Sequence, residues 1–296
     1  MIIQALPAAT VNRVKKQIAN REAYHMLSLG GGVQSSCLFL MNLTGEIQPR
    51  SEFAIFADTQ WERKGTYEYL EYLDAQGAKH GFPPIMKVTA GNIRNDMLAE
   101  QSRYNHMPFY VETQKRGKLN RQCTGYYKIS IINRDLRSIF GMKRRIQQIG
   151  FSLDEISRRN DSNFPKYISP RYPLLEQRMS RADCLSWFSH HGHPLPVKSS
   201  CVGCPFRRDT EWAEMKNSVK EEFDDAVDFG EEIRNKTLSR PKPKSNQLTM
   251  FNLPKPSYKL FIHSSVKPLR VINFGSHDSS ASASAEDEEC QGGCFL

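Results

Sequence analysis

The stretch 24–36, YHMLSLGGGVQSS, decides the fold of this chain. Its apolar beginning is typical of a short buried strand, and the apolar run CLFLMNL that follows it is typical of a helix. Between them come three glycines, a glutamine and two serines: Gly30, Gly31, Gly32, Gln34, Ser35 and Ser36. Glycines let backbone N–H groups approach an anion closely, and a helix N-terminus adds the positive end of its dipole. The stretch therefore predicts a phosphate-binding loop, with a plain glycine-rich turn as the alternative.

Short apolar segments alternate with helical ones on both sides of this loop. The pattern predicts further strands at 51–57, 85–88 and 144–152, and helices over 10–21 and about 64–79. Such alternation favours a parallel, doubly wound α/β sheet, in which ligands lie at the carboxyl ends of the strands. Asp58 follows the second strand, so we expect it on the same rim, where it contacts a nucleotide or caps the next helix.

Composition limits the class of protein. The chain has 296 residues, of which 39% are hydrophobic and 25% charged, as in ordinary globular proteins. Its net charge of +9 suits a polyanionic partner, although solubility alone also accounts for it. No apolar run approaches the roughly 18 residues of a membrane span, and we expect no secretory signal at the start of the chain. We expect a cytoplasmic protein without a membrane partner.

A second motif is the pair Cys201 and Cys204 in CVGCPF. A C-x-x-C turn presents two thiolates to one metal, and a tetrahedral site needs further ligands. Cys123 and Cys184 are the candidates, which together give four thiolates for a 4Fe–4S cluster or a structural zinc. Three histidines between Cys184 and the pair keep a mixed zinc site open: His190, His191 and His193. A redox-active pair without metal is the third alternative.

The loop GGGVQSS resembles the SGGxDS loop of the PP-loop ATP pyrophosphatases. That superfamily includes phosphoadenosine phosphosulfate (PAPS) reductases and enzymes that thiolate tRNA or DNA. Segment 56–62, FADTQWE, matches the family segment that lies beside the nucleotide, and 149–155 with Arg158 matches an IGxxxDE layout with nucleotide-facing residues. Two positions depart from the pattern. Gly30 replaces the first serine, with Ser28 two residues earlier, and Gln34 replaces the aspartate, which leaves ATP cleavage open.

The resemblance implies a fold of the adenine nucleotide alpha hydrolase-like (PP-loop) type, with a cysteine-bearing helical and loop region and a flexible C-terminal tail. It implies ATP or a PAPS-type adenine nucleotide as ligand, with Mg²⁺ as a further ion. The implied nucleotide-binding residues are Ser28, Gly30, Gly31, Gly32, Gln34, Ser35, Ser36, Asp58 and Glu155. The cysteines have an order similar to that of cluster-bearing relatives, though not the same spacing, which favours 4Fe–4S over zinc.

The C-terminal EECQGGC resembles the mobile Glu-Cys-Gly tail of PAPS reductases. It implies that Cys290 or Cys294 is a nucleophile toward the sulfur of a bound sulfonucleotide. Incidental cysteines in an unstructured tail are the alternative.

We therefore expect a PAPS reductase-like enzyme of sulfur transfer or reduction, with a thiol or sulfur-donor protein as partner. One alternative is ATP-dependent thiolation of tRNA or DNA through an adenylated intermediate. Another is a non-catalytic nucleotide- or nucleic-acid-binding module with a structural metal.

Changes in composition predict the boundaries within the chain. An N-terminal helix takes 1–23 and the nucleotide-binding domain with the cysteines takes 24–236. A proline- and lysine-rich linker follows at 237–257, then a packed segment at 258–275. The acidic, cysteine-containing stretch 276–296 is expected to be a flexible tail.

Overall fold

The computed structural model describes residues 8–99, 107–112, 117–159, 161, 164–234 and 259–274. The chain divides into two compact units. Described residues within 1–91 and 124–200 belong to the first unit, and those within 92–123 and 201–289 to the second. Cys290 and Cys294, the linker 237–257 and the tail 276–296 lie outside the described residues. None of the helices in the described ranges has the length and apolar character needed to span a bilayer.

The first unit is built on a sheet of five parallel strands in the order β3-β2-β1-β6-β7. In chain order they are β1 (Ala23–Leu29), β2 (Phe53–Asp58), β3 (Met86–Thr89), β6 (Arg144–Ile149) and β7 (Ile168–Arg171). The chain moves outward from β1 to β3 and then returns to the other side of β1. The carboxyl ends of β1 and β6 therefore flank the topological switch point. The predicted doubly wound α/β sheet is confirmed.

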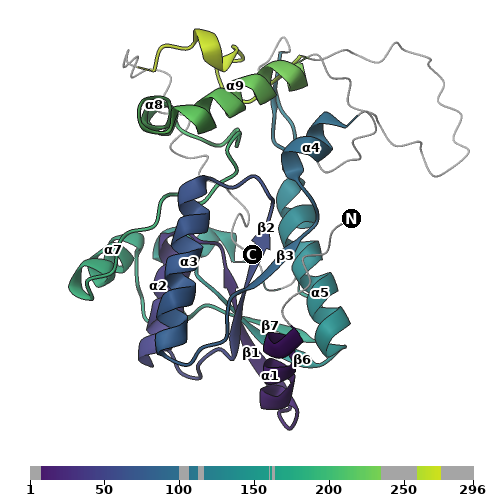
Figure 1. Ribbon diagram of the computed structural model, residues 1–296, viewed down its shortest axis with the longest axis vertical. Coiled ribbons are helices and arrows are strands. Elements are labelled where there is room, and N and C mark those ends of the chain that lie inside the picture. Colours follow the sequence, from purple (N-terminus) through teal and green to yellow (C-terminus); the bar gives the residue numbers. More distant parts are fainter. Residues whose placement is uncertain are drawn as a thin grey trace, which may run out of the picture. The chain divides into compact units, whose positions relative to one another are not determined.

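Helices cover both faces of this sheet (Figure 1). One face carries α2 (Val33–Thr44), α3 (Lys64–Lys79), α6 (Pro173–Glu176) and α7 (Arg181–His190). The other carries α1 (Ala8–Ile18) and α5 (Ile131–Phe140), and a π-helical turn, η1 (Thr124–Ser130), leads into α5. Leu27 and Leu29 pack with α2, whereas Tyr24 and Met26 pack with α1 and α5. This alternation along β1 follows the two-residue period of a strand.

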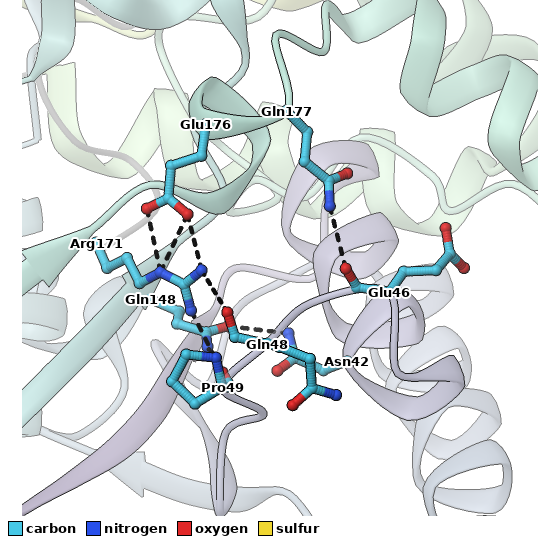
Figure 2. Close-up of polar contacts among 8 residues, drawn as sticks. All are labelled: Asn42, Glu46, Gln48, Pro49, Gln148, Arg171, Glu176 and Gln177. Carbon is cyan, nitrogen blue, oxygen red and sulfur yellow. Dashed lines mark hydrogen bonds and ion pairs between the residues drawn. The ribbon is translucent and has the colours of Figure 1, made fainter.

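The loop between α2 and β2 is fixed by polar contacts (Figure 2). Asn42 on α2 donates to the side chain of Gln148 on β6 at 2.9 Å, and Gln148 donates to the Pro49 carbonyl at 3.0 Å. Arg171, at the end of β7, donates to the same carbonyl at 3.3 Å and pairs with Glu176 at 2.7 Å. Because Asn42 and Gln148 are fully buried, their amides need these partners. The contacts hold the C-terminal half of α2 to β6.

The N-terminal end of α2 packs against the turn that follows β6. A Cβ atom on Gly150 would lie 2.7 Å from the Cα and 2.8 Å from the backbone nitrogen of Ser35. Both distances are far below van der Waals contact, and neither atom belongs to a movable side chain. Glycine at 150 is therefore required for this approach, which holds the start of α2 at the switch point.

The second unit contains a small antiparallel sheet in the order β5-β4-β8. Its elements are α4 (Ile93–Leu98), β4 (Tyr110–Val111), β5 (Gly117–Lys118), α8 (Asp209–Ser218), α9 (Lys220–Arg234), β8 (Leu260–Phe261) and the 3₁₀ turn η4 (Leu269–Val271). Arg94 on α4 donates to Asp225 and Glu232 on α9 at 2.8 and 3.0 Å. Strand β8 comes from the segment predicted to pack after the linker.

Replacing Gly150 with alanine is expected to lower the free energy of unfolding by about 1–3 kcal/mol, because the added methyl group forces two backbone segments apart. Urea unfolding measures the change. Gly125→Ala is the control, since a Cβ there would meet nothing within 4 Å. Equal stability of the two variants would contradict the close approach.

Candidate functional site

The three glycines connect β1 to α2 in a turn held by serine hydroxyls. Gly31 has a φ of 73°, in the left-handed region that glycine enters freely. Ser35 Oγ accepts a hydrogen bond from the Gly30 N–H at 3.1 Å and donates to the Gly32 carbonyl at 3.3 Å. Ser199 Oγ donates to the Gly30 carbonyl at 2.5 Å. Residues of the first unit alone therefore preorganise the loop.

The N-terminus of α2 keeps its positive partial charge. Gly32 stands at the N-cap without a capping side chain, and the first turn contains no acidic residue. Ser36, in the same turn, is fully buried, yet its Oγ has no hydrogen-bond partner in the described part of the chain. Because buried hydroxyls are normally paired, this one is available to an oxygen of a bound anion. Helix N-termini attract such anions.

Thr66, in the first turn of α3, brings a second hydroxyl to the loop. Its Cγ2 would lie 3.2 Å from a Cβ on Gly31, so it covers the turn directly. Thr66 is fully buried, and among the described residues its Oγ1 also lacks a hydrogen-bond partner. The segment that carries Ser199 also contacts α3, where Val197 packs against Gly65. A Cβ atom on Gly65 would lie only 3.1 Å from the methyl carbons of Val197, so the glycine leaves room for this contact.

Asp58 lies at the carboxyl end of β2, as predicted, and organises the turn that follows. Its Oδ1 accepts from the Gln60 N–H at 2.7 Å and from the Tyr67 hydroxyl at 2.8 Å. Burial, followed by the charge of Asp58, raises the pKa of Tyr67, so that hydroxyl stays protonated and donating. The role of Asp58 toward a nucleotide or Mg²⁺ stays a prediction.

A buried ion pair lies in the segment that resembles the nucleotide-side motif. The Glu62 side chain is fully buried; its Oε1 accepts from Thr59 Oγ1 at 3.2 Å and lies 3.4 Å from Lys128 Nζ. A buried carboxylate needs such a partner, and removing the lysine would leave its charge uncompensated. The pair therefore joins the end of β2 to η1.

Two predicted nucleotide-binding residues contact other side chains of the first unit. Ser28 lies in β1, and its Oγ accepts from Gln147 Nε2 at 2.9 Å. Glu155, in the 3₁₀ turn η2 (Leu153–Arg158), is buried and pairs with Arg158. Contact of Ser28 or Glu155 with a nucleotide stays a prediction.

Gln34 joins α2 to the start of α7. Its Oε1 accepts a hydrogen bond from Arg181 Nη1 at 3.0 Å. The backbone N–H of Arg181 donates to Asp154 Oδ2 at 2.5 Å, and the Ser152 hydroxyl donates to the same oxygen at 3.1 Å. These two hydrogen bonds hold the pKa of Asp154 below its usual range, and the bond from Arg181 has the largest effect. The carboxylate therefore stays ionised and anchors the N-terminus of α7.

The predicted metal ligands divide between the two units. Cys201 and Cys204 share a turn of the second unit, in which the Cys204 N–H donates to the Cys201 carbonyl at 3.1 Å, and Cys123 belongs to the same unit. Cys184 is fully buried in the core of the first unit, where its hydrogen bond with Cys37, followed by burial, raises the pKa of Cys37. Across the described ranges, no three His, Cys, Asp or Glu side chains form a group able to hold a metal ion. The metal centre stays a prediction.

Thr66, Ser199 and Arg181 were not among the predicted site residues. Thr66 and Ser199 contact the glycine turn and Arg181 contacts Gln34, each at a separation along the chain that no motif records. Thr66 is the one of the three with a local signal, because a hydroxyl in the first turn of a helix could have been predicted to belong to the site.

Solved structures that are similar to this chain include a PAPS reductase and a tRNA thiolase. The chain is similar to phosphoadenylyl-sulfate (PAPS) reductase from Candida auris in a phosphate complex, with 12% identity, 65% of this chain and 90% of that chain covered, and a TM-score of 0.38. It is also similar to the U34-tRNA thiolase NcsA from Methanococcus maripaludis with its [4Fe-4S] cluster. The two share 14% identity, the match covers 76% of this chain and 78% of that chain, and the TM-score is 0.40. The sequence matches no protein-family model and no curated protein. Neither similarity assigns a role to a residue of this chain.

Alanine at Ser35 is expected to lower the stability of the ligand-free protein, whereas alanine at Ser36 is not. Ser35→Ala leaves the Gly30 N–H without its partner and costs about 1–3 kcal/mol. Ser36→Ala removes an unpaired buried hydroxyl, so the ligand-free protein should lose nothing or gain stability. Urea unfolding without ligand measures both. A similar loss in both variants would show that Ser36 is an ordinary structural residue.

Proposed function

We propose that the first unit binds an adenine nucleotide with its phosphates at the N-terminus of α2. The observation that carries the proposal is the uncapped start of this helix at the switch point, with the unpartnered Ser36 hydroxyl in the same turn. Backbone N–H groups and hydroxyls together suit the oxygens of a phosphate. The resemblance of segments 56–62 and 149–155 to nucleotide-facing motifs supports adenine as the base.

The chemistry that we propose is sulfur transfer or reduction by a PAPS reductase-like enzyme. A thiolate of Cys290 or Cys294 attacks the sulfur of a PAPS-type nucleotide and a sulfur–sulfur bond forms. The bond from sulfur to the bridging oxygen breaks, and its electron pair leaves with the nucleoside phosphate. Donors at the start of α2 would stabilise the negative charge that develops on this phosphate. The C-terminal sequence EECQGGC supports the nucleophile.

A 4Fe–4S cluster or zinc held by cysteines belongs to this proposal without entering the step above. Cys201 and Cys204 are the pair that one turn already brings together. Cys123, in the same unit, would be a further ligand. Cys184 has the surroundings of a core residue, so a centre that uses it would require the core of the first unit to open.

The net charge of +9 favours one second candidate, ATP-dependent thiolation of tRNA or DNA. In that reaction an oxygen of the nucleic acid attacks the α-phosphate of ATP and pyrophosphate leaves. The same helix N-terminus would bind the phosphates. Release of pyrophosphate from ATP on addition of tRNA or DNA would favour thiolation, whereas release of the nucleoside phosphate from PAPS in the presence of a thiol would favour reduction.

Nucleotide binding tests the first part of the proposal. ATP and PAPS are each expected to raise the melting temperature of the protein and to bind measurably in calorimetric titrations. Ser36→Ala and Thr66→Val should each weaken binding about tenfold, the effect of one lost hydrogen bond to a charged group.

Ser51→Ala is the matched control. Ser51 also has a buried hydroxyl without a hydrogen-bond partner among the described residues, but it precedes β2, at the opposite end of the sheet. Its substitution should leave the affinity unchanged. If neither ATP nor PAPS stabilises the protein, the proposed function is wrong.

A further inference from the structure

The solvent-facing side of the first turn of α2 is formed by Gln34 and Arg181. Ser35 and Ser36 are buried, Gln34 is half-buried and Arg181 is exposed. The Arg181 guanidinium approaches within 3.0 Å of the Gln34 amide oxygen. A ligand that reaches the start of α2 from solvent therefore meets this arginine.

The contact with Gln34 does not neutralise the charge of Arg181. An amide oxygen accepts a hydrogen bond without carrying a negative charge, and a guanidinium has five N–H donors, so further donors remain for a ligand. The charge of Arg181 also acts on Asp154, a nearby carboxylate that accepts hydrogen bonds from the backbone N–H of Arg181 and from the Ser152 hydroxyl. Asp154 thus fixes the position of α7 while the arginine side chain extends to Gln34.

Nothing in the first turn of α2 suits a divalent cation. Mg²⁺ is held in proteins through carboxylates and the phosphates of its substrate. The described first turn contains no acidic residue. Positive charge at this end of the site comes from the helix and from Arg181.

We propose that Arg181, held by Gln34, binds the phosphate or sulfate end of the nucleotide directly, and that the nucleotide is bound in its metal-free form. The inference rests on the proposed nucleotide site and adds to it the residue that replaces Mg²⁺. Arginine suits the role because its planar fork can donate two parallel hydrogen bonds to one anionic group. An aspartate at 34 would instead pair with Arg181 and neutralise it.

The test is a set of titrations with ATP and PAPS, each in EDTA and in Mg²⁺. For the wild-type protein, the dissociation constants in the two buffers should agree within about twofold. Arg181→Gln should weaken binding about tenfold in both buffers, the loss of a charge-assisted contact. Gln34→Asp should weaken binding about tenfold in EDTA, because the new carboxylate neutralises Arg181. In Mg²⁺ this variant should regain part of the lost affinity, because the same carboxylate offers the metal a ligand.

Arg178→Gln is the matched control, because Arg178 is exposed, carries the same charge and lies three residues earlier. It should bind like the wild type, and urea unfolding should show that every variant is folded. Binding that requires Mg²⁺, or equal affinities of Arg181→Gln and Arg178→Gln, would overturn the inference. If Ser36→Ala weakens binding while Arg181→Gln does not, only the inference fails. If the wild type binds neither nucleotide in either buffer, the proposed function fails and the inference with it.

Discussion

The approach of the turn after β6 to the first turn of α2 is the constraint on which the site depends. Gly150 lets two backbone segments come closer than any side chain would allow. Together with the contact between Asn42 and Gln148, it holds α2 against β6 along its length. Since the chain continues from β1 to β2 on one side and from β6 to β7 on the other, the start of α2 lies at the switch point, where doubly wound sheets bind ligands.

The start of α2 keeps its positive partial charge because the sequence places no capping side chain and no acidic residue there. A serine, threonine or aspartate at the N-cap would have paired the first N–H groups of α2, and an acidic residue would have offset its dipole. Gly32 and Gln34 do neither, and the Ser36 hydroxyl lacks a partner among the described residues. An unpaired buried hydroxyl costs about 1–3 kcal/mol. Such a cost at one end of a helix is typical of a site that is completed by a ligand.

The sequence predicted what depends on local pattern. Strands β1, β2, β3 and β6 and helix α3 were predicted within a few residues, because apolar runs bounded by glycine or polar residues specify them. Strand β7 was missed because ISPR is short and contains a proline. The glycine loop was predicted, but Thr66, Ser199 and Arg181 were not, since only the fold brings them near it. Cys184 was grouped with the other cysteines by counting thiolates, and the core around it had no signature in the spacing.

The most direct test of the central claim is an amide NMR titration of the full chain with PAPS and with ATP. If phosphates bind at the start of α2, the amide resonances of Gly31, Gly32, Val33 and Gln34 should shift first and most strongly, and Ser36→Ala should reduce those shifts at equal nucleotide concentration. Saturable binding that shifts other amides and leaves these four unchanged would contradict the account.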